Sequence, residues 1–340
     1  MAVSLVSTGV TFPDGSIQTT RASQAPAFTN RIINGAMVID QRNAGALINP
    51  AVSGFTVDRW SYFQNQTSKG TIGQNAGAVT PPVGFTNYLG FTSTSAYALL
   101  TADQFLIRQD IEGLNTYDLA WGTASAATVT LSFWVRSSLT GSFGGAIQNS
   151  GRDRNYPFAF VINSANTWEY KTVTIVGDTT GTWLTTNGRG IAVTFSVGTG
   201  ATYSATAGAW TGTSFITAPT GATSVVGTNG ATFYITGVQL EKGSTATSFD
   251  YRPYGTELAL CQRYFWTLNG RVIYLSDYGA ASLYITNVYF PVAMRATPTI
   301  TNNLAGSPTV PGTSISTLGF GIYNSTAGSS FDAATATAEL

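Results

Sequence analysis

The stretch from Phe233 to Leu268 constrains the fold most, because two unlike hydrophobic patterns meet in it. In its first part apolar side chains alternate with polar ones, which predicts a half-buried β-strand. The apolar positions of this strand are Phe233, Ile235, Val238 and Leu240. The alternation slips at Gly237, and a glycine at such a slip predicts a β-bulge. The sequence therefore predicts that a β-domain closes with its last strand here.

After Thr256 the apolar spacing changes to steps of three and four residues, which predicts one face of a short helix. The residues on that face are Leu258, Cys261, Phe265 and Leu268. Thr256 is the expected N-cap, and Glu257 would lie at the positive end of the helix dipole. A lone thiol on this apolar face predicts a small core residue at Cys261. A second domain is therefore predicted to begin through this helix, and a single domain with an internal helix is the alternative.

The composition favours β-structure over helix. Only 9% of the 340 residues are charged, 43% are hydrophobic and 37 are glycine. Thr, Val and aromatic residues pack well on a pleated surface, whereas glycine is typical of turns. A charged fraction so far below the usual quarter is tolerated when much of the surface is buried in an oligomer.

Charge and special residues exclude several classes of function. The chain has 16 basic and 16 acidic residues and no basic run, so no nucleic-acid partner is expected. No apolar run approaches the length of a membrane span, so no membrane insertion is expected. Cys261 is the only cysteine, which excludes an internal disulfide. The chain has no histidine, the commonest general base and metal ligand.

Short candidate strands with Gly, Asn and Ser at the breaks follow one another, which is typical of a β-sandwich. They are predicted at 87–92, 105–111, 129–135, 158–161, 168–175, 191–197 and 233–240. Earlier strands are predicted at 32–39, interrupted by Asn34-Gly35, and at 56–63 around Trp60. Beyond the helix, strands are predicted at 272–275, 282–290 and 315–323.

Several segments resemble a jelly-roll module of bacteriophage tail-fibre and virion proteins that is related to carbohydrate-binding modules. YITGVQLEKGSTATSFDYRP resembles its closing strand and tail, NGAMVIDQRN its opening, and VTLSFWVRSSLTGSF an internal strand. ELALCQRYF resembles the junction that follows, and FPVAMRATPTIT resembles a C-terminal knob of such fibres. The resemblance covers roughly residues 30–265, contains no catalytic fingerprint, and depends on the order of many weak pieces.

The resemblance implies three parts. Residues 1–29 would be an N-terminal virion-attachment segment with a turn at Pro13-Asp14-Gly15, ordered by other virion proteins or by the other chains of a trimer. A flexible leader is the alternative for its first few residues. Residues 30–255 would be the jelly-roll β-sandwich of the carbohydrate-binding-module type, and residues 256–340 the junction helix and a small β knob. Because a lone small sheet is marginal, the knob predicts a homotrimer. The expected protein is all-β and exposed on the virion.

Tryptophans near turns are the candidate sugar-binding residues, since flat rings stack on sugar rings. They are Trp121, Trp168, Trp183 and Trp210. A core or edge position is the alternative for each of them. Trp134 lies mid-strand and is either a core residue or an exposed platform.

Carboxylates are the candidate residues for catalysis and for calcium binding. Glycoside cleavage requires two carboxylates facing each other across a groove. The candidate acids are Asp103, Asp110, Glu112, Asp118, Asp153, Asp178 and Glu241. Asp110 and Glu112 share a strand face, which suits a metal or a solvent-exposed pair better than an opposed acid and base. No catalytic residue and no enzymatic activity are therefore predicted.

Structural calcium is common in the related carbohydrate-binding modules, so the resemblance implies it as a candidate cofactor. The oxygen-bearing residues in the matching regions are Asn34, Asp40, Asp58 and Glu241. Their spacing does not match a calcium loop.

The predicted function is that of a bacteriophage structural protein, namely a tail fibre or receptor-binding protein that adheres to host-surface glycan. A head fibre or capsid decoration protein with a mainly structural role is the alternative. A polysaccharide-cleaving fibre is the least favoured hypothesis.

Overall fold

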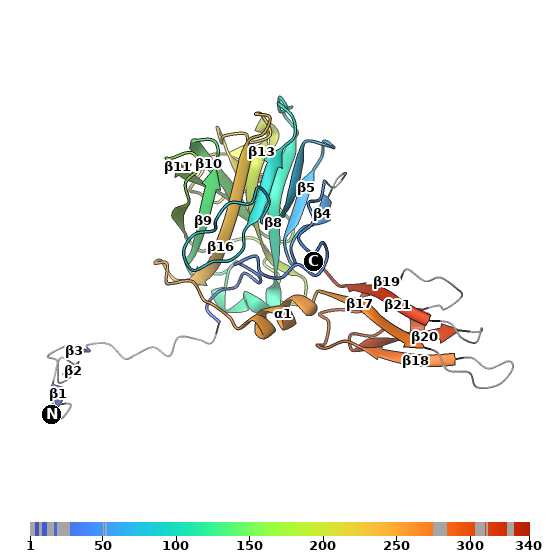
Figure 1. Cartoon of the computed structure of the whole chain (residues 1–340). Coiled ribbons are helices and arrows are strands. Elements are labelled where there is room, and N and C mark those ends of the chain that lie inside the picture. The colour runs from blue at the N-terminus through green and yellow to red at the C-terminus, as the bar shows by residue number, and fades with distance from the viewer. Residues whose placement is uncertain are drawn as a thin grey trace.

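Two antiparallel sheets pack face to face in a β-sandwich (Figure 1). The computed structural model describes residues 4–6, 9–11, 17–18, 28–49, 51, 53–274, 284–302, 310, 312–324 and 330–340. The six-stranded sheet contains, in spatial order, β11 (Asn155–Ile162), β10 (Gly141–Gln148), β13 (Arg189–Thr199), β8 (Gln104–Glu112), β5 (Ser61–Gln64) and β4 (Ser53–Phe55). The five-stranded sheet contains β12 (Glu169–Ile175), β9 (Val129–Ser137), β16 (Thr232–Lys242), β7 (Leu89–Ser93) and β6 (Gly70–Gln74). From β7 to β13 the chain repeatedly crosses between the sheets, so the fold is a jelly roll, as predicted.

Alternation along the strands builds the core between the sheets. In β8, Phe105, Ile107 and Ile111 face inward and are at most 3% exposed. The rings of Phe133 and Phe195, from opposite sheets, meet edge to face with centroids 5.0 Å apart. Each such buried side chain contributes about 1.5–3 kcal/mol of hydrophobic stabilisation. The sandwich therefore has a large core of its own.

The predicted bulge in β16 is confirmed. Its register with β9 shifts between Thr236 and Gln239, and Gly237 has a φ of 59°. A Cβ at Gly237 would lie 2.6 Å from the ring of Phe85. Both the left-handed backbone and this close approach require glycine here.

The strands predicted from 87 to 240 are confirmed in position, but the strand predicted at 32–39 is wrong. That segment is a loop in which Asn34 and Met37 each have a φ of 58°. The Asn34 side chain holds the loop closed, because its Nδ2 donates to the Ile39 carbonyl at 2.8 Å and its Oδ1 accepts the Ile39 N–H at 3.0 Å. The strand predicted at 56–63 begins only at Ser61.

The sandwich strands β4 and β6 were not predicted, and neither was β10. Its glycines weaken the apolar alternation, yet a Cβ at Gly145 would lie 1.8 Å from the carbonyl oxygen of Thr194 in β13. The segment after β13 contains the short parallel pair β14 (Ser204–Ala205) and β15 (Ala218–Pro219). Four short 3-10 helices complete the described elements: η1 (Gly113–Asn115), η2 (Tyr117–Leu119), η3 (Ala201–Tyr203) and η4 (Gly312–Ser314).

The predicted junction helix is present as α1 (Tyr254–Gln262), but its predicted bounds are wrong. Pro253 is the N-cap, and therefore Thr256 lies inside the helix. Phe265 and Leu268 belong to the next strand, β17 (Phe265–Tyr274). Trp266 and Leu268 are two residues apart, a spacing that also suits one face of a strand, and pairing with β21 decides the conformation.

The C-terminal part consists of two small antiparallel sheets. One orders β17, β21 (Ser330–Thr337) and β19 (Thr299–Asn302), and the other pairs β18 (Tyr284–Tyr289) with β20 (Gly319–Asn324). Their apolar cluster includes Trp266, Phe290 and Phe320 together with three alanines. This cluster is separate from the sandwich core, so the C-terminal part has a small core of its own.

A third apolar cluster joins the C-terminal part to the sandwich. Cys261 and Tyr264 are fully buried against Ile33 and Ile39, and Leu340 packs at the edge. The prediction that Cys261 is a core residue is confirmed. The thiol therefore lies at the interface between the two parts rather than in either main core.

The described residues of the N-terminal segment form a small antiparallel sheet of β1 (Ser4–Val6), β2 (Gly9–Thr11) and β3 (Ile17–Gln18). The predicted turn at 13–15 lies outside the described residues. Within the described part of the chain, no helix is long and apolar enough to cross a membrane.

Candidate functional site

A groove lies on the outer face of the six-stranded sheet, and we call it the sheet-face groove. Its larger cavity has a volume of about 490 Å³ and lies over β4, β5 and β8. A smaller cavity of about 60 Å³ adjoins it. The two cavities share Phe63, Arg108 and Arg152, so they form one continuous depression.

The floor of the groove follows from strand alternation. In β8 the inward side chains belong to the core, so Leu106, Arg108 and Asp110 point to the outer face. The register of β5 places Phe63 opposite Leu106 and Ser61 opposite Arg108. The floor is therefore a mixed surface of one aromatic ring, one aliphatic side chain and one ion pair.

One wall comes from two loops. The turn between β10 and β11 supplies Arg152, and the segment between β14 and β15 supplies Phe215. Arg152 has a φ of 56° and Phe215 a φ of 64°, conformations that are unusual for residues other than glycine. The Phe215 N–H donates to the Arg152 carbonyl at 2.8 Å, and the Arg152 guanidinium lies 5.8 Å from the Phe215 ring centroid.

The other wall contains Phe55, Arg59 and Glu339. Arg59 also has a positive φ, of 71°. It pairs with the Glu339 carboxylate and donates to the Asp110 carbonyl at 2.5 Å. Backbone strain of this kind costs about 1–3 kcal/mol per residue and clusters at functional sites. Three residues that line the groove have such a backbone.

The charges of the groove are unevenly paired. The Arg108 Nε lies 2.6 Å from Asp110 Oδ1, and the Arg189 Nε lies 3.1 Å from Asp110 Oδ2. One carboxylate thus serves two guanidinium groups. Within the described residues, Arg152 forms no side-chain hydrogen bond or ion pair, and its guanidinium lies near the ring of Phe215. Burial, Arg108 and Arg189 lower the pKa of Arg152 from its usual value, and Asp110 opposes them only in part.

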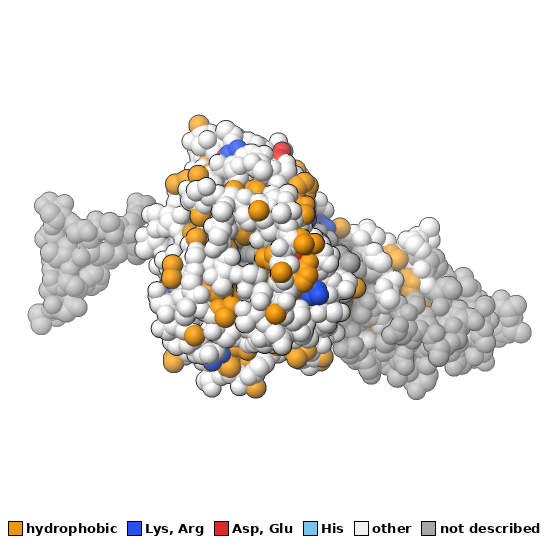
Figure 2. All heavy atoms as spheres, turned by 90° about the horizontal axis from the view of Figure 1, so that it is seen from above, with side chains coloured by type: hydrophobic (Ala, Val, Ile, Leu, Met, Phe, Trp, Pro, Cys, Tyr) orange, Lys and Arg blue, Asp and Glu red, His pale blue; other side chains and the backbone are white. Residues whose placement is uncertain are grey.

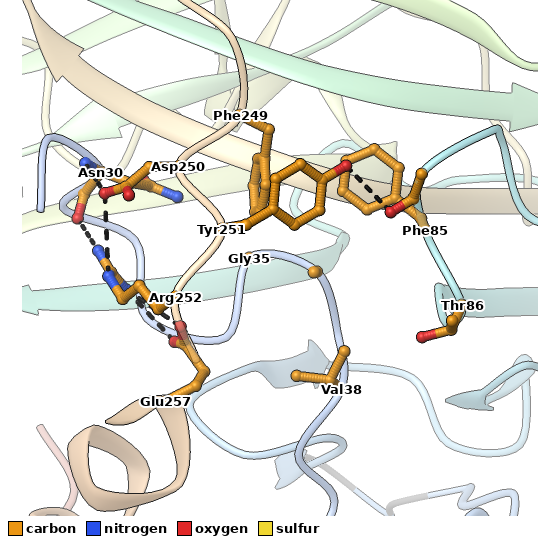
Figure 3. Close-up of a pocket in the computed structure, with 12 residues that line it drawn as sticks. Asn30, Gly35, Val38, Phe85, Thr86, Phe249, Asp250, Tyr251, Arg252 and Glu257 are labelled. Carbon is orange, nitrogen blue, oxygen red and sulfur yellow. Dashed lines mark hydrogen bonds and ion pairs between the residues drawn. The ribbon is translucent and has the colours of Figure 1, made fainter. Parts of the chain in front are cut away.

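A second cavity, of about 130 Å³, lies between the loop after Asn30 and the segment before α1 (Figure 3). The rings of Phe85, Phe249 and Tyr251 pack against one another there, with centroids 4.9–5.5 Å apart. The Tyr251 hydroxyl donates to the Gly84 carbonyl at 3.0 Å. The cavity is smaller than typical ligand pockets of about 300–1,000 Å³, and its rings pin the closing segment to the sandwich.

The four predicted sugar-binding tryptophans lie away from the groove. Trp121, Trp183 and Trp210 form an edge-to-face cluster, with centroids 4.7, 5.4 and 5.5 Å apart. Their indole N–H groups donate to backbone carbonyls at 2.7, 3.1 and 2.8 Å. Trp121 is only 7% exposed, and the other two cover it. Trp168 is separate, with its ring 5.6 Å from Tyr88.

Trp134 lies on the outer face of the five-stranded sheet and is not a core residue. It is half-buried against Tyr170, with the ring centroids 5.5 Å apart. Tyr170 is 44% exposed. The pair forms a small aromatic surface on the face opposite to the groove.

The candidate catalytic acids have partners within the chain. Glu112 accepts hydrogen bonds from Arg263 at 2.8 Å and from the Tyr264 hydroxyl at 2.8 Å. Asp118 pairs with Arg31 at 2.8 Å. The other partners are arginines for Asp110 and Asp178, Tyr97 and Gln66 for Asp103, Asn149 for Asp153, and Gln239 and Thr247 for Glu241.

The calcium candidates are also used inside the chain. Asn34 Nδ2 donates to the Asp58 carbonyl at 2.9 Å, and the Asp58 side chain accepts the Gln41 N–H at 3.1 Å. Asp40 accepts two backbone N–H groups at 2.9 and 2.7 Å, and Glu241 accepts the Thr247 N–H at 2.8 Å. Among the described residues, no group of three or more His, Cys, Asp or Glu side chains is arranged to hold a metal ion.

The sequence contains a signal for part of the groove. If Phe105, Ile107 and Gln109 share one face of a strand, then Arg108 and Asp110 share the other face. An ion pair on the outer face of a central strand is a signal for a polar surface site. Arg152 and Phe215 carry no such signal, because loop conformation alone brings them to the groove.

No protein-family model matches the chain, and no curated protein sequence matches it. Several solved structures are similar. The enzymatically active domain of tailspike protein 4 of bacteriophage CBA120 has a TM-score of 0.33 and 10% identity, over 63% of this chain and 22% of that one. This chain therefore matches less than a quarter of the tailspike chain.

Carbohydrate-binding modules are also similar in structure. A family 11 module from Clostridium thermocellum, in complex with a β-1,3-1,4-mixed-linked tetrasaccharide, has a TM-score of 0.28 and 11% identity, over 58% of this chain and 100% of that one. A family 61 module in complex with β-1,4-galactotriose has a TM-score of 0.28 and 10% identity, over 54% and 88%. With TM-scores this low, the function of this chain has to be inferred from its own residues.

Proposed function

We propose that this chain is a structural protein of a bacteriophage virion, a tail fibre or receptor-binding protein, whose β-sandwich adheres to host-surface glycan through the sheet-face groove. The observation that carries the proposal is the composition of the groove. It combines ring faces with several side-chain donors in a cavity of about 490 Å³. Rings that stack on sugars and donors that bind hydroxyl groups are the parts a glycan site needs.

Binding without turnover is part of the proposal. Asp110 is the carboxylate on the groove floor, and its two oxygens face Arg108 and Arg189. Glu339 on the wall is paired with Arg42 and Arg59. Carboxylates whose oxygens are occupied by arginine side chains are not arranged as an opposed acid and base across the groove. This arrangement supports adhesion rather than cleavage.

The assembly is proposed as a homotrimer that joins the particle through residues 1–29. The small apolar core of the C-terminal part and the charged fraction of 9% support an oligomer. Figure 2 shows that charged side chains are few and scattered over the face seen from above. Electron cryomicroscopy of an intact particle would locate the chain at the tail or on the capsid.

The test of glycan binding compares two sets of variants on an array of bacterial surface polysaccharides. If the groove binds glycan, Phe63→Ala and Phe215→Ala should each lower the signal at least roughly tenfold, from the loss of one stacking partner. Trp168→Ala and Trp183→Ala test the sequence-based assignment to tryptophan in the same assay. Loss of binding only in the tryptophan variants would move the site away from the groove. Steady release of reducing ends would contradict binding without turnover.

A further inference from the structure

Arg152 is a half-buried cation that has no ion-pair partner among the described residues. Of the arginines in or next to the groove, Arg108 and Arg189 share Asp110, and Arg59 shares Glu339 with Arg42. Arg152 is half-buried between the two cavities and has only a ring contact. The groove therefore contains an unneutralised positive charge beside two further guanidinium groups.

The position of Arg152 is held in place rather than flexible. Its carbonyl accepts hydrogen bonds from the Phe215 N–H at 2.8 Å and from Asn155 Nδ2 at 3.2 Å. Its own N–H donates to the Asn149 carbonyl at 3.2 Å. These three bonds fix a left-handed backbone at a residue that is not glycine, and they direct the side chain along the Phe215 ring into the groove.

Such an arrangement costs free energy in the empty protein. Burial and the like charges of Arg108 and Arg189 lower the pKa of Arg152, which means that its charged form is disfavoured there. An anion in the groove would offset this cost, because it would pair with the guanidinium and reduce the repulsion. Arginine is well suited to this role, since its planar fork binds carboxylate and phosphate groups through two parallel hydrogen bonds.

We propose that the sheet-face groove selects acidic glycans, and that Arg152 pairs with the anionic group of the sugar while Phe215 contacts the ring. This inference rests on the proposed glycan binding and names its substrate class. The anionic group is a carboxylate or a sulfate, and both suit the guanidinium fork. Elsewhere, Arg31, Arg154 and Arg252 pair with carboxylates at Asp118, Asp178 and Glu257. Arg136 and Arg295 donate instead to backbone carbonyls.

The test measures the affinity of the full chain for three soluble polymers by affinity electrophoresis: polygalacturonate, dextran sulfate and neutral dextran. The wild type should bind at least one acidic polymer in preference to dextran, and binding should weaken as salt rises. Arg152→Gln should lower that affinity roughly ten- to a hundredfold, the loss of one charge-assisted pair. Arg152→Lys should lower it less, because the charge remains.

The matched control is Arg136→Gln. Arg136 lies on the outer face of the five-stranded sheet, where it donates to the Asn166 carbonyl at 2.9 Å, and its loss should leave the affinity unchanged. Thermal unfolding of each variant identifies any that fail to fold. The preferred acidic polymer identifies the anionic group, and either result supports the inference.

Two outcomes would overturn it. Equal binding of dextran and both acidic polymers, unaffected by Arg152→Gln but weakened by Phe215→Ala, would remove the acidic selectivity and leave glycan binding in place. No binding to these polymers or to the polysaccharide array would overturn the glycan function as well.

Discussion

Glu112 joins the sandwich to the C-terminal part, and replacing it with glutamine should loosen that junction. Glu112 is at the end of β8 and only 1% exposed. Its carboxylate accepts hydrogen bonds from Arg263 Nη2 at 2.8 Å, Arg263 Nε at 3.2 Å and the Tyr264 hydroxyl at 2.8 Å. Burial raises the pKa of Tyr264 to about 12, so that its hydroxyl remains a donor.

The expected loss of stability in Glu112→Gln follows from the hydrogen-bond partners of the Glu112 carboxylate. Removing one side of a buried ion pair costs about 3–5 kcal/mol. The Arg263 side chain is 34% exposed, and glutamine keeps one acceptor oxygen, so the cost should be smaller here. We expect about 2–3 kcal/mol, in the range of hydrogen bonds to charged groups.

Labelling of the single cysteine, Cys261, measures how often the junction opens. Cys261 is fully buried in the apolar cluster that contains Tyr264. Burial and the nearby carboxylates of Asp58 and Glu257 raise the pKa of the thiol well above its usual value, so that labelling requires local opening. If Glu112→Gln destabilises the closed junction by about 2–3 kcal/mol, labelling should be roughly 30- to 150-fold faster.

The control is Asp118→Asn. Asp118 pairs with Arg31 at 2.8 Å but is 39% exposed, so its loss should change the labelling rate less than about fivefold. Equal labelling rates in wild type and Glu112→Gln would show that Glu112 does not hold the junction closed. Rapid labelling of the wild type would contradict the burial of Cys261.

Two further predictions concern pH and assembly. Burial raises the pKa of Asp58 from 3.8 to about 6, so the folded state favours its neutral form. The contribution of Asp58 to folding stability is therefore present below pH 4 and is lost as the pH rises towards 6. The difference in unfolding free energy between wild type and Asp58→Asn should therefore fall by about 2–3 kcal/mol from pH 3.5 to 7.5, and a constant difference in urea titrations would contradict it. Light scattering at low micromolar concentration should give the mass of three chains, and a monodisperse monomer would remove the fibre reading.

Period-two alternation made most of the sandwich predictable. The strands predicted at 105–111 and 233–240 are present as β8 and β16. The bulge predicted at Gly237 is present in β16. The pattern failed where side-chain hydrogen bonds replaced strand pairing. Around Asn34 the apolar residues are buried as a strand would bury them, but the Asn34 amide and two left-handed residues fold the segment into a loop.

Long-range contacts explain the wrong helix bounds at the junction, and they also decide how the tryptophans pack. At the junction, apolar spacing extended the predicted helix over Phe265 and Leu268, but the partner strand β21 comes from the end of the chain and no local pattern announces it. The tryptophans near turns were visible in the sequence, yet that three of them pack on one another depends on where distant loops meet. Sequence patterns therefore predicted layers and strands better than loop contacts.

The three groove residues with a left-handed backbone, Arg59, Arg152 and Phe215, differ in the contacts that offset their strain. Arg59 has a left-handed backbone, but its guanidinium stacks 3.6 Å from the Tyr264 ring centroid and pairs with Glu339, so contacts within the chain can offset the cost. Arg152 and Phe215 have the same kind of backbone, but their side chains lack comparable contacts. Phe215 is 47% exposed, and Arg152 has no carboxylate partner among the described residues. Glycine would adopt either conformation at lower cost. Strain that packing does not explain is expected where a side chain must be presented to a ligand, and these two residues present a cation and a ring to the same cavity.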